Sequence, residues 1–143
     1  MSNCITIGNP AAVCQGTNAI GIGTCAANAC QGCSSIAIGS QAGQSCQGTS
    51  AVAIGTLAGI TQQGSQTVAI GACAGRTAQG NSGIAIGSGA GCTAQAPNSI
   101  ALGVGAGLYS QQGSAIAVGL GAGGCCQGSW SICLLYTSPS PRD

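Results

Sequence analysis

The sequence predicts an all-β chain folded as a parallel β-solenoid, or β-roll, of about eight sixteen-residue coils with two short strands each. A tetrad of two mostly β-branched residues around an alanine, closed by glycine, recurs every sixteen residues. A glutamine recurs at the same interval, and glycine, with 27 copies, falls at fixed places in the unit. Charged residues make up 2% of the chain, against roughly 25% in an average domain, which suits side chains stacked on copies of themselves.

Each tetrad is expected to form the first strand of its coil. β-Branched residues favour strands, and the closing glycine suits a tight corner. The first tetrad, residues 5–8, precedes the second by fifteen residues, and all later tetrads follow at intervals of sixteen. These later tetrads begin at Ile20, Ile36, Val52, Val68, Ile84, Ile100 and Ile116.

The repeated glutamine is expected at the end of the second strand. An Ala-Gly pair marks the corner before this strand, and Gln-Gly with the polar residues after it marks the next. A helix is excluded, because each glycine costs about 1 kcal/mol in a helix. Coils stacked about 4.8 Å apart would align the glutamines in a ladder whose amides can bond to one another. The ladder comprises Gln15, Gln31, Gln47, Gln63, Gln79, Gln95, Gln111 and Gln127.

Alternation along the tetrad indicates which side chains face inward. The alanine points to one side of the strand and the branched residues to the other. A thin roll has room for alanine, so we expect Ala53, Ala85 and their equivalents inside. The branched residues would then form an outer apolar face, which association with further copies would cover; the alternative is a wider coil that buries them in a monomer. The expected oligomer face is Ile36, Ile38, Val52, Ile54, Val68, Ile70, Ile84, Ile86, Ile100, Leu102, Ile116 and Val118.

The composition argues against most chemistry. Histidine, lysine and glutamate do not occur, and the charged residues are Arg76, Arg142 and Asp143. General acid–base catalysis, carboxylate metal sites and nucleic-acid binding therefore lack the groups they need. No apolar run of about 18 residues predicts a transmembrane helix. We expect a protein that is not an enzyme, uses no cofactor, binds no nucleic acid and has no membrane span in this segment.

The 11 cysteines form columns rather than a metal motif. Cys14, Cys30 and Cys46 share the column beside the glutamine. Stacked cysteines lie within the Cα separation that a disulfide spans, so this column could hold disulfides such as Cys14–Cys30. Alternatively, it holds free thiols, mostly buried in an alanine-sized slot. Cys30 and Cys33 form a single C-x-x-C with no second pair and no histidine, which does not indicate zinc.

The units IAIGSQAGQSCQGTS, VAIGTLAGITQQGSQ and IAIGSGAGCTAQAPNS resemble the head repeats of trimeric autotransporter adhesins, and similar repeats of viral and phage fibres. The resemblance covers about residues 5–132. It implies a left-handed β-roll, a homotrimer and an extracellular position on a cell outer membrane or a virion. It also implies binding to a host or matrix surface. The function expected is therefore that of a structural and adhesive fibre segment.

Two other functions fit the same fold. Solenoids with flat threonine arrays can bind ice, and Thr61, Thr77 and Thr93 form one short column here. No Thr-x-Thr pair recurs on a strand, so the array would be small. A viral or phage fibre spacer without a ligand is the other alternative.

Residues 133–143 depart from the repeat. Their sequence, CLLYTSPSPRD, resembles a translated reading frame of a transposase adapter used in sequencing libraries. We expect residues 1–132 to form the solenoid, as a fragment of a longer protein, and residues 133–143 to be a non-native, disordered tail. The alternative is a genuine tail rich in proline and serine.

Overall fold

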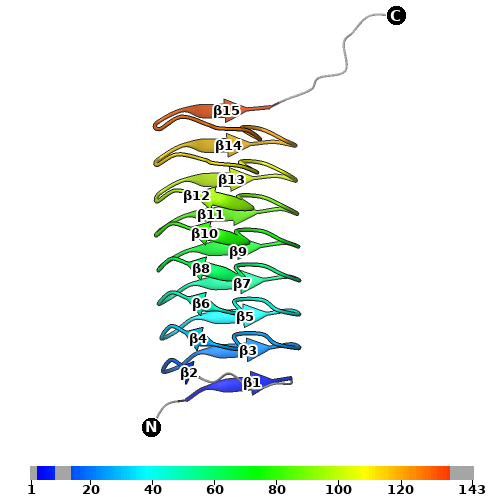
Figure 1. Cartoon of the computed structure of the whole chain (residues 1–143), viewed down its shortest axis with the longest axis vertical. Coiled ribbons are helices and arrows are strands. Elements are labelled where there is room, and N and C mark those ends of the chain that lie inside the picture. The colour runs from blue at the N-terminus through cyan, green and yellow to red at the C-terminus, as the bar shows by residue number, and fades with distance from the viewer. Residues whose placement is uncertain (1–2, 9–13, 136–143) are drawn as a thin grey trace, which may run out of the picture.

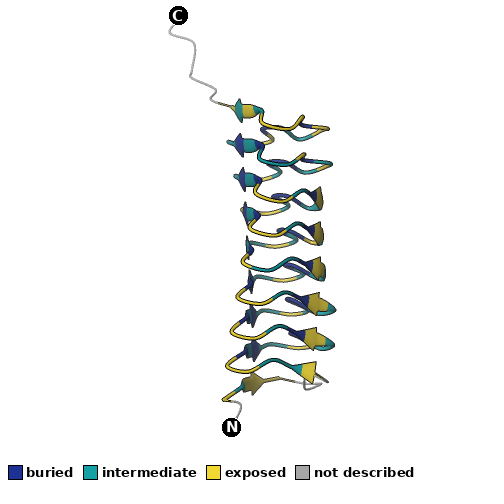
Figure 2. Ribbon diagram, turned by 90° about the vertical axis from the view of Figure 1, so that its left-hand side faces the viewer, coloured by how far each residue is buried: buried dark blue, intermediate teal, exposed yellow. Residues whose placement is uncertain are grey.

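The computed structural model describes residues 3–8 and 14–135, and it confirms the parallel β-solenoid (Figure 1). The chain makes about 8 turns of roughly 16 residues, and the described residues include no helix. The strands form two parallel sheets. In Figure 2 these sheets appear as two layers that run along the axis of the rod.

The tetrads form the larger, nine-stranded sheet. Each strand pairs in parallel with its equivalent in the next coil, so that Ala53 lies opposite Ala69. The short first spacing is accommodated without a break, because Ile5 lies opposite Ile20. The strands are β1 (Ile5–Ile7), β3 (Ile20–Ile22), β5 (Ile36–Ile38), β7 (Val52–Ile54), β9 (Val68–Ile70), β11 (Ile84–Ile86), β13 (Ile100–Leu102), β14 (Ile116–Val118) and β15 (Ile132–Leu134).

The segments that end in glutamine form the second, six-stranded sheet. Its strands are β2 (Cys14–Gln15), β4 (Cys30–Gln31), β6 (Cys46–Gln47), β8 (Thr61–Gln63), β10 (Thr77–Gln79) and β12 (Thr93–Gln95). Single bridges from Thr93 to Tyr109 and from Tyr109 to Cys125 continue the pairing into later coils. The two strands expected in each coil are therefore present over most of the rod.

Alanine fills the interior, as the alternation of the tetrad predicts. The branched residues of the same strands point outward and are only partly covered, so the alternative of a wider coil that buries them is wrong. The interior is too thin for side chains of that size, since a Cβ on Gly59 would already lie 3.3 Å from the Cβ of Ala53. The core residues with no exposed surface include Ala37, Ala42, Ala53, Ala58, Ala69, Ala74, Ala85, Ala90, Ala101, Ala106 and Ala117.

The glutamines connect the two sheets across this interior. The Nε2 atom of Gln111, which is fully buried, donates to the backbone oxygens of Ile100 at 2.8 Å and Ala115 at 3.1 Å. It also donates to Oε1 of Gln127 at 3.2 Å. The expected amide-to-amide bonds therefore occur at some steps of the ladder, but the shorter bonds reach backbone carbonyls of the opposite strand and the following corner.

Strand β15 extends past the expected domain boundary at residue 132. Cys133 pairs with Ala117 and Leu134 with Val118. The amide of Leu135 donates to the oxygen of Val118 at 2.9 Å. Cys133 and Leu134 therefore belong to strand β15, and Leu135 continues the hydrogen bonding to the preceding coil, so these three residues are not a disordered tail. The rest of the expected tail, residues 136–143, lies outside the described residues.

Replacing Gln111 tests whether the buried amide stabilises the stack. The Gln111→Leu variant loses the bonds to Ile100, Ala115 and Gln127, and it leaves Oε1 of Gln127 without this donor. We expect the free energy of unfolding to fall by about 1–3 kcal/mol in urea titration. The matched control is Gln112→Leu, because Gln112 is the exposed neighbour. Equal stability of the two variants would contradict this role.

The glycine that closes each tetrad is required by the next coil. Gly103 has φ of +126°, and a Cβ on it would lie 2.6 Å from the backbone oxygen of Gly119. Gly105, two residues later, has φ of +66° and open space around it. Cys73 occupies the position equivalent to Gly105 two coils earlier, with φ of 58°.

These two glycines form a matched pair of test positions. We expect Gly103→Ala to lower the free energy of unfolding by about 3 kcal/mol or more, because overpacking and backbone strain add together. Gly105→Ala should cost only about 1–2 kcal/mol, the strain of a left-handed residue. Thermal unfolding followed by circular dichroism measures both. A Gly103→Ala variant as stable as Gly105→Ala would show that the coils do not approach each other this closely.

Candidate interaction face

The outward side of the nine-stranded sheet is a continuous apolar surface, which we name the apolar face. The structure places every residue of the expected oligomer face on it, in two columns that run along the rod. Most of these side chains are partly buried, since each is covered by equivalents above and below, while Ile86 is 37% exposed. The apolar face comprises Ile36, Ile38, Val52, Ile54, Val68, Ile70, Ile84, Ile86, Ile100, Leu102, Ile116 and Val118.

The apolar face continues around one corner near the C-terminal end of the rod, which the sequence analysis missed. Val104 and Leu120 are 54% and 71% exposed. They follow Leu102 and Val118 by two residues. The equivalent position in an early coil is Thr24. The change from a polar to an apolar residue at this repeat position could have revealed the extension from the sequence.

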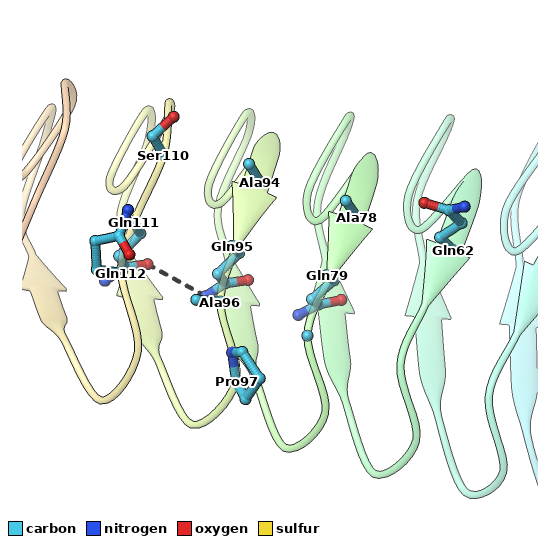
Figure 3. A pocket seen from close by; sticks show the side chains of 11 residues that line it. Gln62, Ala78, Gln79, Ala94, Gln95, Ala96, Pro97, Ser110, Gln111 and Gln112 are labelled. Carbon is cyan, nitrogen blue, oxygen red and sulfur yellow. Dashed lines mark hydrogen bonds between the residues drawn. The ribbon is translucent and has the colours of Figure 1, made fainter. Parts of the chain in front are cut away.

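The outer side of the six-stranded sheet carries a shallow groove. Figure 3 shows Gln62, Ala78, Ala94 and Ser110 in a row along it. This part has a volume of about 500 Å³, and a second part of about 470 Å³ reaches back to Cys30 and shares Gln62. None of the residues that line either part is charged.

The groove follows from the packing of the coils. Its floor includes glycines such as Gly64, where a Cβ would lie 2.7 Å from the amide nitrogen of Asn81. Since the stack itself requires these glycines, the groove needs no ligand to explain it. Its lining residues include no acidic or basic side chain.

The cysteine column beside the glutamines lies on this same outer side. Cys14, Cys30 and Cys46 pair in register from coil to coil, and all are exposed and free. The expectation of mostly buried thiols is therefore wrong. The column precedes the inward-facing glutamine by one residue, and alternation along the strand turns the thiols to the outside.

The threonine column is used within the stack. The hydroxyl of Thr77 donates to the backbone oxygen of Cys92 at 3.1 Å, and that of Thr93 to Leu108 at 3.0 Å. Thr61 makes the equivalent bond to Arg76 at 3.5 Å. These half-buried hydroxyls therefore stabilise neighbouring coils and form only a small outer array.

Arg76 is the only charged side chain among the described residues, and it lies close to Cys73 and Cys92. Burial raises the pKa of the Cys92 thiol, the neighbouring Cys73 raises it further, and Arg76 partly offsets both effects.

Among the described residues, no group of histidine, cysteine and acidic side chains is arranged to hold a metal ion. The described part of the chain also contains no helix long and apolar enough to cross a membrane.

Comparison with known proteins adds no relative. No family model, curated protein or solved structure matches this chain. Its faces and side chains therefore provide the evidence on function.

The raised pKa of Cys92 predicts slow alkylation that accelerates with pH. Alkylation proceeds through the thiolate, so a raised pKa leaves less of the reactive form at pH 8. We expect Arg76→Gln to slow the reaction of Cys92 further and to move its pH midpoint upward. Peptide-resolved mass spectrometry after timed iodoacetamide treatment measures this rate. Cys46, an exposed thiol distant in sequence, is the internal control and should react equally in both proteins.

Proposed function

We propose that this chain is a rod segment of a surface fibre, that it is not an enzyme, and that it assembles as a homotrimer through the apolar face. Its polar surfaces remain outward and bind a host or matrix surface. The observation that carries the proposal is the apolar face, which runs along the rod with no charged residue in its columns. Soluble monomers rarely leave a surface of this kind in water.

Burial of the apolar face would supply the energy of assembly. Each methylene group removed from water contributes about 0.8 kcal/mol, and the two columns of branched side chains extend over most of the coils. Arg76 is not among the residues of this face, so charge repulsion between copies does not oppose contact. The side chains are also held by their column neighbours, so little conformational entropy remains to be lost on association.

A further copy of the same chain is the partner that suits this face best. The columns repeat at the coil spacing, and another copy in parallel offers side chains with the same spacing along the full length. Closed symmetry lets several copies turn their apolar faces toward one axis. The resemblance of the repeat to trimeric adhesin heads favours three copies.

The polar corners support an adhesive role at an extracellular surface. Thr49, Gln66, Asn81 and Asn98 are exposed at four successive corners opposite those that hold the Ala-Gly pairs. Equivalent groups recur at every coil, so a ligand with many copies of one epitope could be held by many weak contacts at once. Ice binding is less well supported, because the threonine hydroxyls already donate within the stack.

Charge placed on the apolar face tests the assembly. We expect the wild-type rod to sediment as a trimer and the double variant Ile54→Lys, Ile86→Lys to sediment as a monomer, because each buried ammonium group would be unpaired. The matched control is Gln62→Lys, Ala94→Lys, which places two lysines two coils apart on the opposite sheet and should remain a trimer. Circular dichroism checks that all three proteins retain their strands.

The same proteins separate the proposed function from its alternatives. The trimer should bind a collagen-coated sensor surface more tightly than the monomeric variant, by about 10²-fold if several copies engage together. A wild-type monomer that shows thermal hysteresis would instead identify an ice-binding protein. A trimer that binds no host or matrix surface would identify a spacer.

A further inference from the structure

At the corner after a tetrad, one residue faces the next coil. The residue that it faces lies nineteen positions further along the chain. A Cβ placed on Gly89 would lie 3.6 Å from Cδ1 of Leu108. One coil earlier, sixteen residues before each of these, stand Cys73 and Cys92. The coil geometry therefore directs Cys73 toward Cys92.

The backbone confirms that the two coils are equivalent at these positions. Cys73 and Gly89 both adopt left-handed conformations, with φ of 58° and 68°. The amide of Cys73 donates to Thr56 at 2.9 Å, as that of Gly89 donates to Ala72 at 2.8 Å.

The strands that follow these corners also correspond. The backbone oxygen of Cys92 accepts from the amide of Thr77 at 2.9 Å, as the oxygen of Leu108 accepts from the amide of Thr93 at 3.1 Å. The backbone on both sides of this contact therefore has the same geometry in the two coils.

No other described coil places two cysteines in this contact. Nineteen-residue pairs there are Cys25 with Gln44, Gln41 with Ile60, Leu57 with Arg76, Gly89 with Leu108, and Gly105 with Gly124. At Cys73 and Cys92, both members are cysteines, and both are free and half-buried. Burial is the main cause of the raised pKa of Cys92, and the neighbouring Cys73 thiol is a further cause, which agrees with this approach.

We propose that Cys73 and Cys92 form a disulfide that joins two consecutive coils, when a small-molecule disulfide such as oxidised glutathione is present. One cysteine thiolate attacks the glutathione disulfide and releases one glutathione as a thiol. The second cysteine attacks the mixed disulfide and releases the other. The two protein thiols lose two protons and two electrons, and oxidised glutathione is reduced to two molecules of glutathione.

The stacked column of Cys14, Cys30 and Cys46 is less suitable for disulfides. Its side chains point the same way from strands about 4.8 Å apart, so their Cβ atoms are separated by about the coil spacing. A disulfide requires Cβ atoms about 3.5–4.5 Å apart. Cys73 lies at a corner and Cys92 directly before strand β12, so their side chains approach from different directions and can converge.

The disulfide would close the chain segment between the two cysteines and restrict the unfolded state. It would also prevent local separation of two coils in the middle of the rod. An extracellular fibre meets the oxidising conditions that such a bond needs. This modification is independent of assembly through the apolar face, because the two involve different surfaces.

A single cleavage site between the cysteines gives a direct test. Arg76 lies between Cys73 and Cys92, and the other arginine is Arg142. The full chain is treated with oxidised glutathione, its remaining thiols are alkylated, and it is denatured and digested with trypsin. We expect the fragments on either side of Arg76 to stay linked until a reductant is added, and mass spectrometry to identify Cys73 joined to Cys92.

Matched variants decide which cysteines form the link. Cys73→Ser and Cys92→Ser should each abolish it, and Cys25→Ser, a change in the same column, should not. Adding Gln44→Cys should create a second link, to Cys25, if the nineteen-residue contact is general; both residues precede Arg76, so this link is measured as two fewer alkylated thiols within that fragment. Fragments that separate without a reductant, or a link that persists in Cys73→Ser, would overturn the proposal. Sedimentation of the oxidised protein reports assembly separately, so failure of the disulfide does not imply failure of the trimer.

Discussion

In-register stacking of consecutive coils is the constraint on which the rest of this structure depends. The amide of Gly55 donates to Ile38 in the preceding coil at 2.8 Å, and Gly71 repeats this bond to Ile54. Because each residue lies over its equivalent, a charge would lie over a like charge, and any bulky group on the inside would have to fit in every coil. The near absence of charge and the repeated glycines follow from this geometry.

The thin interior reverses the usual distribution of side chains. Alanine and the amide groups of glutamine are buried, whereas isoleucine and valine lie outside. The buried amides are tolerated because each donates to backbone carbonyls of the opposite strand and the next corner, as Gln95 does to Ile84 at 2.8 Å and to Ser99 at 3.3 Å. The large branched side chains of the tetrad strands therefore lie on the outside, and this is why we propose assembly through the apolar face.

The two sheets consequently have different outer surfaces. The nine-stranded sheet presents branched side chains in long columns, suited to contact with a similar rod. The six-stranded sheet presents small and polar residues, exposed thiols and a groove that follows from its glycines. The proposed disulfide lies at a corner between these surfaces, where a side chain such as Cys73 can reach the next coil without disturbing either sheet.

The sequence by itself determined the coil length, the tetrad strands and the inward alanines, because a sixteen-residue period and strand alternation are local properties. Only the tertiary structure decided where Gln111 donates, since its carbonyl partners lie on another strand and at a later corner. It also decided that Gln62, Ala78 and Ala94 adopt φ of 53° in the middle of their strands, although their residue types do not require it. The approach of Cys73 to Cys92 likewise depends on how a corner of one coil meets the strand of the next, which no pattern within a single repeat contains.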